Sequence, residues 1–125
     1  MLKSVMAKKW VLRFASYKTP DDIFNLVVNG QKTIETRPNT KDFNVGDKLV
    51  LVSMVSKRKI EKTISFVHIY KSPKEMLEVE DFNKIFPNIG SKEKLLEVYE
   101  IAKTKWGKKY KNELETFGIV AIGIK

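Results

Sequence analysis

The chain has 125 residues and a formal net charge of +9, from 24 Lys and Arg against 15 Asp and Glu. This length suits one domain with its own core, and the hydrophobic content of 42% argues against global disorder. The absence of cysteine excludes disulfides, cysteine-based zinc sites and thiol nucleophiles. With His68 as the single histidine, we expect no metal and no other cofactor.

The positive charge predicts a surface that attracts polyanions, with nucleic acid as the leading candidate. The alternative is that lysine is simply abundant in the source proteome. Residues 1–10 lack the uninterrupted apolar run of a secretory signal, and no segment has the apolar length needed to cross a bilayer. We therefore expect a soluble, cytoplasmic monomer.

The first half of the chain predicts three strands and one helix. Thr19 suits the N-cap of the helix, Pro20 suits its first position, and Gly30 can end it. Pro38 limits how far the strand after this helix can extend. The predicted strands are Trp10–Phe14, Lys32–Arg37 and Leu49–Val52, the last of them opened by the turn Val45–Asp47.

A hairpin is predicted in the middle of the chain, with its tip at Lys57–Lys59 and a strand over Ile60–Tyr70. Alternation along this strand places Ile64, Phe66 and His68 on one face. His68 thus alternates with core residues, which is more typical of a buried, hydrogen-bonded histidine than of a ligand.

The second half predicts two helical regions and a closing strand. One region begins at Ser72–Pro73, and the other covers Lys92–Trp106 and ends at Gly107. The strand Phe117–Ile124 contains two glycines, as bends in a barrel require. Together these elements predict an α+β fold: a small, partly closed β-barrel of five to six strands with about three flanking helices.

Three charged residues, Lys32, Glu35 and Arg37, lie in a strand-like segment, where Val, Ile or Thr would be usual. Glu35 and Arg37 are two apart in a strand and share a face. Lys32 could contact a phosphate or carbonyl group, act as a base, or simply pair with Glu35 at the surface. Arg37 is suited to bind a phosphate through two hydrogen bonds. For Glu35, a ligand contact and a structural ion pair are equally consistent with the sequence.

The segment Lys103–Lys111 interleaves five lysines with Trp106 and Tyr110. Basic grooves with aromatic stacking faces bind single-stranded nucleic acid. The alternative is a helix end whose dipole favours lysine, with Trp106 in an apolar stripe facing the core. A second basic cluster is interpreted as solvated hairpin charge; it consists of Lys57, Arg58, Lys59 and Lys62.

The order of these motifs resembles the ASCH domain family, a branch of the PUA-like barrels. The resemblance extends from about residue 9 to residue 124, so that residues 1–125 are expected to form one such domain. The segments that carry it are Trp10–Phe14, Ile23–Arg37, Val45–Asp47, Met76–Glu80, Ile85–Ile89, Leu96–Tyr99 and Gly118–Ile122.

The resemblance implies a barrel with a cleft beside the helix that precedes Lys32, and a role in binding RNA or other nucleic acid. The family's architecture also places the loop of Ser16, Tyr17 and Lys18 at this cleft. The residues expected to bind nucleic acid are Lys18, Lys32, Thr33, Glu35, Arg37, Lys105, Lys108 and Lys109.

The resemblance also implies an alternative, because some small members hydrolyse N4-acetylcytidine without a metal. Those members pair the lysine with a threonine three positions later and with a glutamate shortly before the last helix. Here Lys32 would be the base and Glu35 occupies the threonine position, while Glu80 or Glu93 would have to supply the second carboxylate. A third possibility is a role in binding a protein partner; this would need an exposed apolar patch, and the sequence shows no obvious one.

Overall fold

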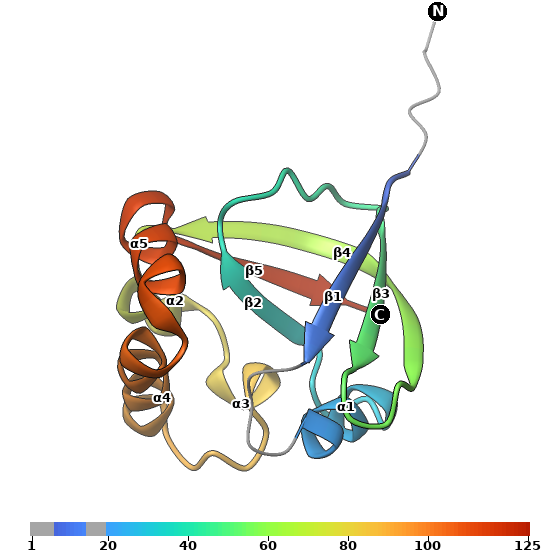
Figure 1. The fold of residues 1–125 in the computed structure, drawn as a ribbon, viewed down its shortest axis with the longest axis horizontal. Coiled ribbons are helices and arrows are strands. Elements are labelled where there is room, and N and C mark those ends of the chain that lie inside the picture. The colour runs from blue at the N-terminus through green and yellow to red at the C-terminus, as the bar shows by residue number, and fades with distance from the viewer. Residues whose placement is uncertain (1–6, 15–19) are drawn as a thin grey trace, which may run out of the picture.

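A computed structural model describes residues 7–14 and 20–125, which form five strands and five helices (Figure 1). Every helix formed by these residues is too short or too polar to span a membrane. In chain order the elements are β1 (Lys9–Phe14), α1 (Pro20–Val28), β2 (Ile34–Pro38), β3 (Lys48–Ser53), β4 (Lys59–Tyr70), α2 (Pro73–Val79), α3 (Phe82–Ile85), α4 (Lys92–Lys105), α5 (Gly107–Phe117) and β5 (Ile119–Ile124).

The five strands form one curled sheet in the order β1-β3-β4-β5-β2. Strands β1 and β3 are parallel, and the other neighbouring pairs are antiparallel. The curl brings the two edge strands together. Arg37 Nη2 on β2 donates a hydrogen bond to the carbonyl of Arg13 on β1 at 3.1 Å. The α+β fold with a partly closed barrel, as predicted from the sequence, is confirmed.

The closing strand β5 is buried along its whole length and separates two apolar cores. One core lies inside the curl, where α1 packs on β1 and β3 through side chains such as Phe24 and Leu51. The other lies between the sheet and helices α2, α4 and α5, with Leu95 and Leu114 at its centre. Figure 1 shows these helices gathered at the end of the sheet that is far from β3.

Strand β4 does not keep the predicted alternation, because its register with β5 shifts between Ile64 and Phe66. As a result Ile64 and Val67 pack in the core under α1, whereas Phe66 packs in the other core. His68 is half exposed and not buried, and its Nδ1 lies 2.7 Å from Glu80 Oε2. The irregularity of β4 is therefore what breaks the period-two pattern of the sequence.

The expected helical regions are present, and two further helices, α3 and α5, accompany them. Helix α4 ends at Lys105 with Trp106 as its C-cap, close to the predicted end, but Gly107 starts α5 at once instead of leading into a loop. Its φ of +91° provides the turn between the two helices. The sequence does not reveal α5 because its lysine-rich start also suits the end of the preceding helix.

Candidate functional site

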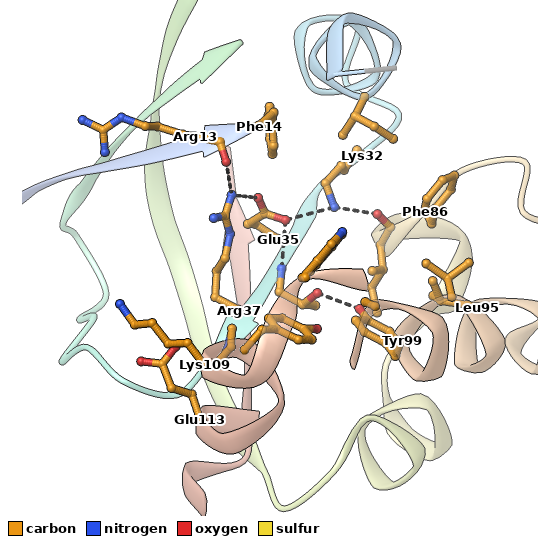
Figure 2. Close-up of a pocket in the computed structure, with 18 residues that line it drawn as sticks. Arg13, Phe14, Lys32, Glu35, Arg37, Phe86, Leu95, Tyr99, Lys109 and Glu113 are labelled. Carbon is orange, nitrogen blue, oxygen red and sulfur yellow. Dashed lines mark hydrogen bonds and ion pairs between the residues drawn. The ribbon is translucent and has the colours of Figure 1, made fainter. Parts of the chain in front are cut away.

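A cavity of about 400 Å³ opens at the seam between the two sheet edges, where helices α4 and α5 face β2 (Figure 2). Strand β1 contributes Phe14 to its wall, and α3 contributes Ile85. Strand β2 supplies Glu35 and Arg37, and the segment that leads into it supplies Lys32. This segment of the sequence, unusual in its charge, therefore lines a cavity.

Lys32 is positioned by the turn that ends α1. Its backbone N–H donates to the carbonyl of Leu26, and its side chain then extends into the protein. The ammonium group donates to the carbonyls of Ile34 at 2.7 Å and Ile85 at 2.6 Å, and lies 3.4 Å from Glu35 Oε1. Three acceptors thus surround a group with three N–H bonds, which is the environment that suits a charged lysine.

Glu35 joins the two cations of the motif. Its Oε1 faces Lys32 and accepts from the Thr36 N–H at 3.0 Å, and its Oε2 accepts from Arg37 Nη2 at 3.1 Å. Burial alone would raise the pKa of Glu35, but the charges of Lys32 and Arg37 outweigh it, so that the pKa lies below the ordinary 4.5. Burial lowers the pKa of Lys32, against the opposing effect of the Glu35 charge.

Arg37 is the outermost member of this set, with 29% of its side chain exposed, against 6% for Lys32 and 7% for Glu35. Its Nη2 is shared between Glu35 and the Arg13 carbonyl, and its guanidinium lies 5.9 Å from the ring centre of Phe14. Arg37 therefore has a fixed orientation and a face open to the cavity. That combination suits an anion-binding group.

Aromatic residues of α4 and α5 form the opposite wall. The hydroxyls of Tyr99 and Thr36 share a hydrogen bond of 2.6 Å, which ties α4 to β2. Trp106 and Tyr110 meet edge to face, with ring centres 4.8 Å apart. Trp106 lines the cavity and is 38% exposed, so the alternative that placed it in an apolar stripe facing the core is wrong. Burial, aided by the charge of Glu35 and opposed by Arg37, raises the pKa of Tyr110 to about 12.

The structure brings together four of the predicted binding residues: Lys32, Glu35, Arg37 and Lys109 all line the cavity. Within the described part of the chain, three others lie outside it. Thr33 is held by its backbone, which bonds Lys84 and Ile124, and Lys105 and Lys108 are exposed beyond the cavity wall. Ser16, Tyr17, Lys18 and the expected N-cap Thr19 lie outside the described residues.

Of the carboxylates considered for the hydrolase, Glu35 lines the cavity, whereas Glu80 and Glu93 lie outside it as the described residues form it. Glu80 is turned toward the far end of β4, where it accepts from Tyr70 and contacts His68. Glu93 sits in the first turn of α4. The second cavity carboxylate is Glu113 of α5, beside Lys109 in Figure 2.

Three residues of the site, Glu113, Thr36 and Tyr99, were not predicted from the sequence. Glu113 was missed because α5 was not predicted. Had a helix been predicted from Lys109 onward, its 3.6-residue period would have placed Tyr110 and Glu113 on one face. Thr36 and Tyr99 meet across 63 positions of sequence. No local signal could have joined these two.

Asp47, in the turn Val45–Asp47 before β3, has a structural role. Asp47 is buried and accepts hydrogen bonds from the backbone N–H groups of Lys8 and Asn44 at 3.0 Å each, and from Trp10 Nε1 at 2.9 Å. Burial would raise the pKa of this carboxyl, but these donors hold it below its ordinary value. Asp47 thereby fastens the start of β1 to the loop before β3.

Comparison with known proteins identifies the ASCH domain family, whose pattern matches residues 18–125. Two solved structures share the fold: the crystal structure of hypothetical protein PH0355 and the solution NMR structure of protein PF0455 from Pyrococcus furiosus. The first has a TM-score of 0.70 at 24% identity, covering 94% of this chain and 97% of that one. The second has a TM-score of 0.59 at 20% identity, covering 96% of each. No curated protein matches the chain.

Proposed function

The chain belongs to the ASCH domain family, and from this premise we propose that it binds single-stranded RNA and holds one nucleotide in the cavity between β2 and the α4–α5 junction. Membership of the family supports RNA binding or a related function in general terms. The cavity supplies what a nucleotide needs, namely a cation for a phosphate, an aromatic face for a base and polar groups for the base edge.

The observation that carries this proposal is that Arg37 and Trp106 line the same cavity and are both partly exposed. Arg37 is oriented by Glu35 and the Arg13 carbonyl, so that it can contact a phosphate with little loss of side-chain freedom. The Trp106 ring offers a stacking surface for any base. The net charge of +9 favours association with a polyanion.

The test is a fluorescence titration of a labelled single-stranded RNA at two salt concentrations. Trp106→Ala should lower the affinity by about 1–3 kcal/mol, the range for one stacked base. Arg37→Gln should weaken binding and reduce the slope of log affinity against log salt by about 0.7. Lys74→Gln on α2 is the matched control, because it removes one exposed charge remote from the cavity.

Wild-type affinity that is absent, or that does not change with salt, would exclude the proposal. So would losses in both cavity variants no larger than that of Lys74→Gln. Each variant also needs a thermal unfolding curve, because Arg37 links the two sheet edges and its removal loosens the seam.

A second candidate is hydrolysis of an acylated pyrimidine nucleoside such as N4-acetylcytidine. The observation that favours it is a buried lysine with a lowered pKa, Lys32, in a cavity that also holds Glu35 and Glu113. Binding ranks first because the Lys32 ammonium is already surrounded by three acceptors, whereas a general base must offer a lone pair to the substrate.

This candidate is tested by incubating the protein with N4-acetylcytidine and following the release of cytidine. Release by the wild type that disappears in Lys32→Ala, with the variant still folded, would place hydrolysis first. If no cytidine forms at high concentrations of a protein that binds RNA, the cavity is a binding site alone.

A further inference from the structure

The outer surface of β1, β3 and β4 is determined by strand register. Along β1 the residues alternate between buried and exposed, with Leu12 and Phe14 in the core and Arg13 outside. The register aligns Lys9 with Lys48, and it aligns Arg13, through Val52 of β3, with Lys59 of β4. Residues opposite one another in a sheet share a face. We name this surface the outer sheet face; its cations are Lys9, Arg13, Lys48 and Lys59.

The outer sheet face is strongly basic for its size. Within the paired rows of these three strands, Glu61 is the acid on this side, and its ion pair with Lys9 at 3.2 Å is exposed. Exposed pairs of this kind contribute little, so that Lys9 stays available to a ligand. Lys48 donates to Thr63 at 2.7 Å, a neutral partner that leaves its charge uncompensated.

This face is continuous with the cavity through β1. The Arg13 carbonyl accepts from Arg37 at the seam, whereas Figure 2 shows the Arg13 side chain extending away from Lys32 and Glu35. A chain that leaves the cavity at Arg37 and crosses the β1 edge would therefore reach the Arg13 guanidinium next. Lys59 lies beyond it, two strand spacings away in register.

The dimensions suit a stretch of nucleic acid backbone more than a single small anion. Two strand spacings separate Arg13 from Lys59 by about 10 Å, and four residues separate Arg13 from Lys9 by about 13 Å. Four long cationic side chains are thus distributed over a surface and do not converge on one point. Single-strand binding sites of small barrels use such an arrangement to follow a backbone.

We propose that the outer sheet face binds the phosphates of the RNA that flanks the nucleotide in the cavity, with the strand crossing the β1 edge at Arg13. This inference rests on the proposed function. It adds a second surface, and it predicts that affinity grows with RNA length beyond what the cavity can hold.

The experiment compares a dinucleotide with a single-stranded RNA of about ten nucleotides, within the range of site sizes for such folds. The double variant Lys9→Gln/Lys59→Gln removes two exposed cations that do not line the cavity. The control Lys71→Gln/Lys74→Gln removes the same charge near α2, at the opposite end of the sheet (Figure 1).

The first double variant should bind the longer RNA about tenfold more weakly and reduce its salt slope by about 1.4, the effect of two phosphate contacts. Its affinity for the dinucleotide should stay at the wild-type value, and the control should lose much less. Equal losses in the two double variants would overturn the inference. So would a double variant that retains RNA affinity but no longer binds anionic phospholipid vesicles, because the face would then be a lipid surface.

Failure of the proposed function looks different in the same assay. If Arg37→Gln and Trp106→Ala leave dinucleotide binding unchanged, the cavity does not hold a nucleotide. In that case, the affinities of the two double variants for the longer RNA would still test whether the outer sheet face binds RNA.

Discussion

Glu35→Gln should destabilise the protein strongly, although glutamine has nearly the same shape. Glutamate at this position balances the buried ammonium of Lys32 at 3.4 Å and also holds Arg37. In the variant, Lys32 keeps the carbonyls of Ile34 and Ile85 but loses its counter-charge. A buried charge that loses its partner costs about 3–5 kcal/mol, and because two carbonyls remain, we expect a loss of about 3 kcal/mol.

Such a loss is large against the total stability of a domain, which is about 5–15 kcal/mol. Urea unfolding at pH 7, followed by tryptophan fluorescence, measures it directly as a shift of the midpoint at constant m-value. Adding Lys32→Met should recover part of the loss, because the uncompensated charge disappears with the lysine. The double variant should therefore be more stable than the sum of the single losses predicts, by at least about 1 kcal/mol.

The pH dependence provides a second test of the same pair. The pKa of Glu35 is below 4.5 in the folded protein, so its contribution is fully present above pH 4.5 and is lost as the pH falls through the folded-state pKa. The stability difference between wild type and Glu35→Gln should shrink accordingly in acid. A difference under about 1 kcal/mol at pH 7, or strictly additive effects of the two substitutions, would refute a stabilising role of the buried pair.

Two further predictions concern the scaffold. Asp47→Asn should cost about 2–3 kcal/mol in urea unfolding, because an amide nitrogen at this buried position cannot accept from the donors that now bind the carboxylate, Trp10 Nε1 among them. An unchanged midpoint would contradict this. The cost should fall in acid as the wild-type carboxyl protonates. Gly118→Ala should lower the melting temperature far more than Gly107→Ala. Both glycines have positive φ, but an added Cβ at Gly118 would lie 2.2 Å from the Tyr70 carbonyl oxygen, whereas at Gly107 it would meet no atom within 4 Å. Equal shifts of the two melting temperatures would show that φ alone decides.

The sequence predicts the strands well because their signals are local. The predicted strand Trp10–Phe14 lies within β1, and glycine and proline delimit the β2 region. The continuous apolar run of β5 indicates a strand covered on both sides. In the structure, one apolar core lies on each side of β5, which accounts for this run. The partly closed barrel also followed from these signals, whereas the cleft was expected from the family resemblance alone.

The misinterpreted elements depend on distant contacts. Phe66 leaves the face of Ile64 because the register shift seats its ring against Gly123, where an added Cβ would lie 2.2 Å from it. Gly107 turns the chain from α4 directly into α5, although a glycine at the end of a helix commonly leads into a loop. Neither outcome can be derived from the residue type, since each depends on what the neighbouring element presents.

The charged motif was predictable as a group, since Lys32, Glu35 and Arg37 are neighbours in sequence. The different roles of the three residues were not predictable, because these roles depend on how deeply each side chain is buried. Lys32 and Glu35 are almost fully buried and satisfy each other and the backbone, whereas Arg37 reaches the cavity. Under the proposed function, burial thus gives the first two a supporting role and leaves Arg37 to contact the ligand.

Substitutions at Glu35 and at Arg37 differ in what they remove. Glu35 orients Arg37 through Oε2 while its Oε1 balances Lys32, so that loss of Glu35 removes the support of the guanidinium together with the stability of the fold. A loss of RNA affinity in Glu35→Gln would therefore not show that Glu35 touches RNA. Because Arg37→Gln leaves the buried Lys32–Glu35 pair in place, it tests the contact with far less disturbance of the fold. The affinity of the folded fraction of each variant is accordingly the quantity to compare, and the two variants should lose the same phosphate contact if Glu35 acts through Arg37.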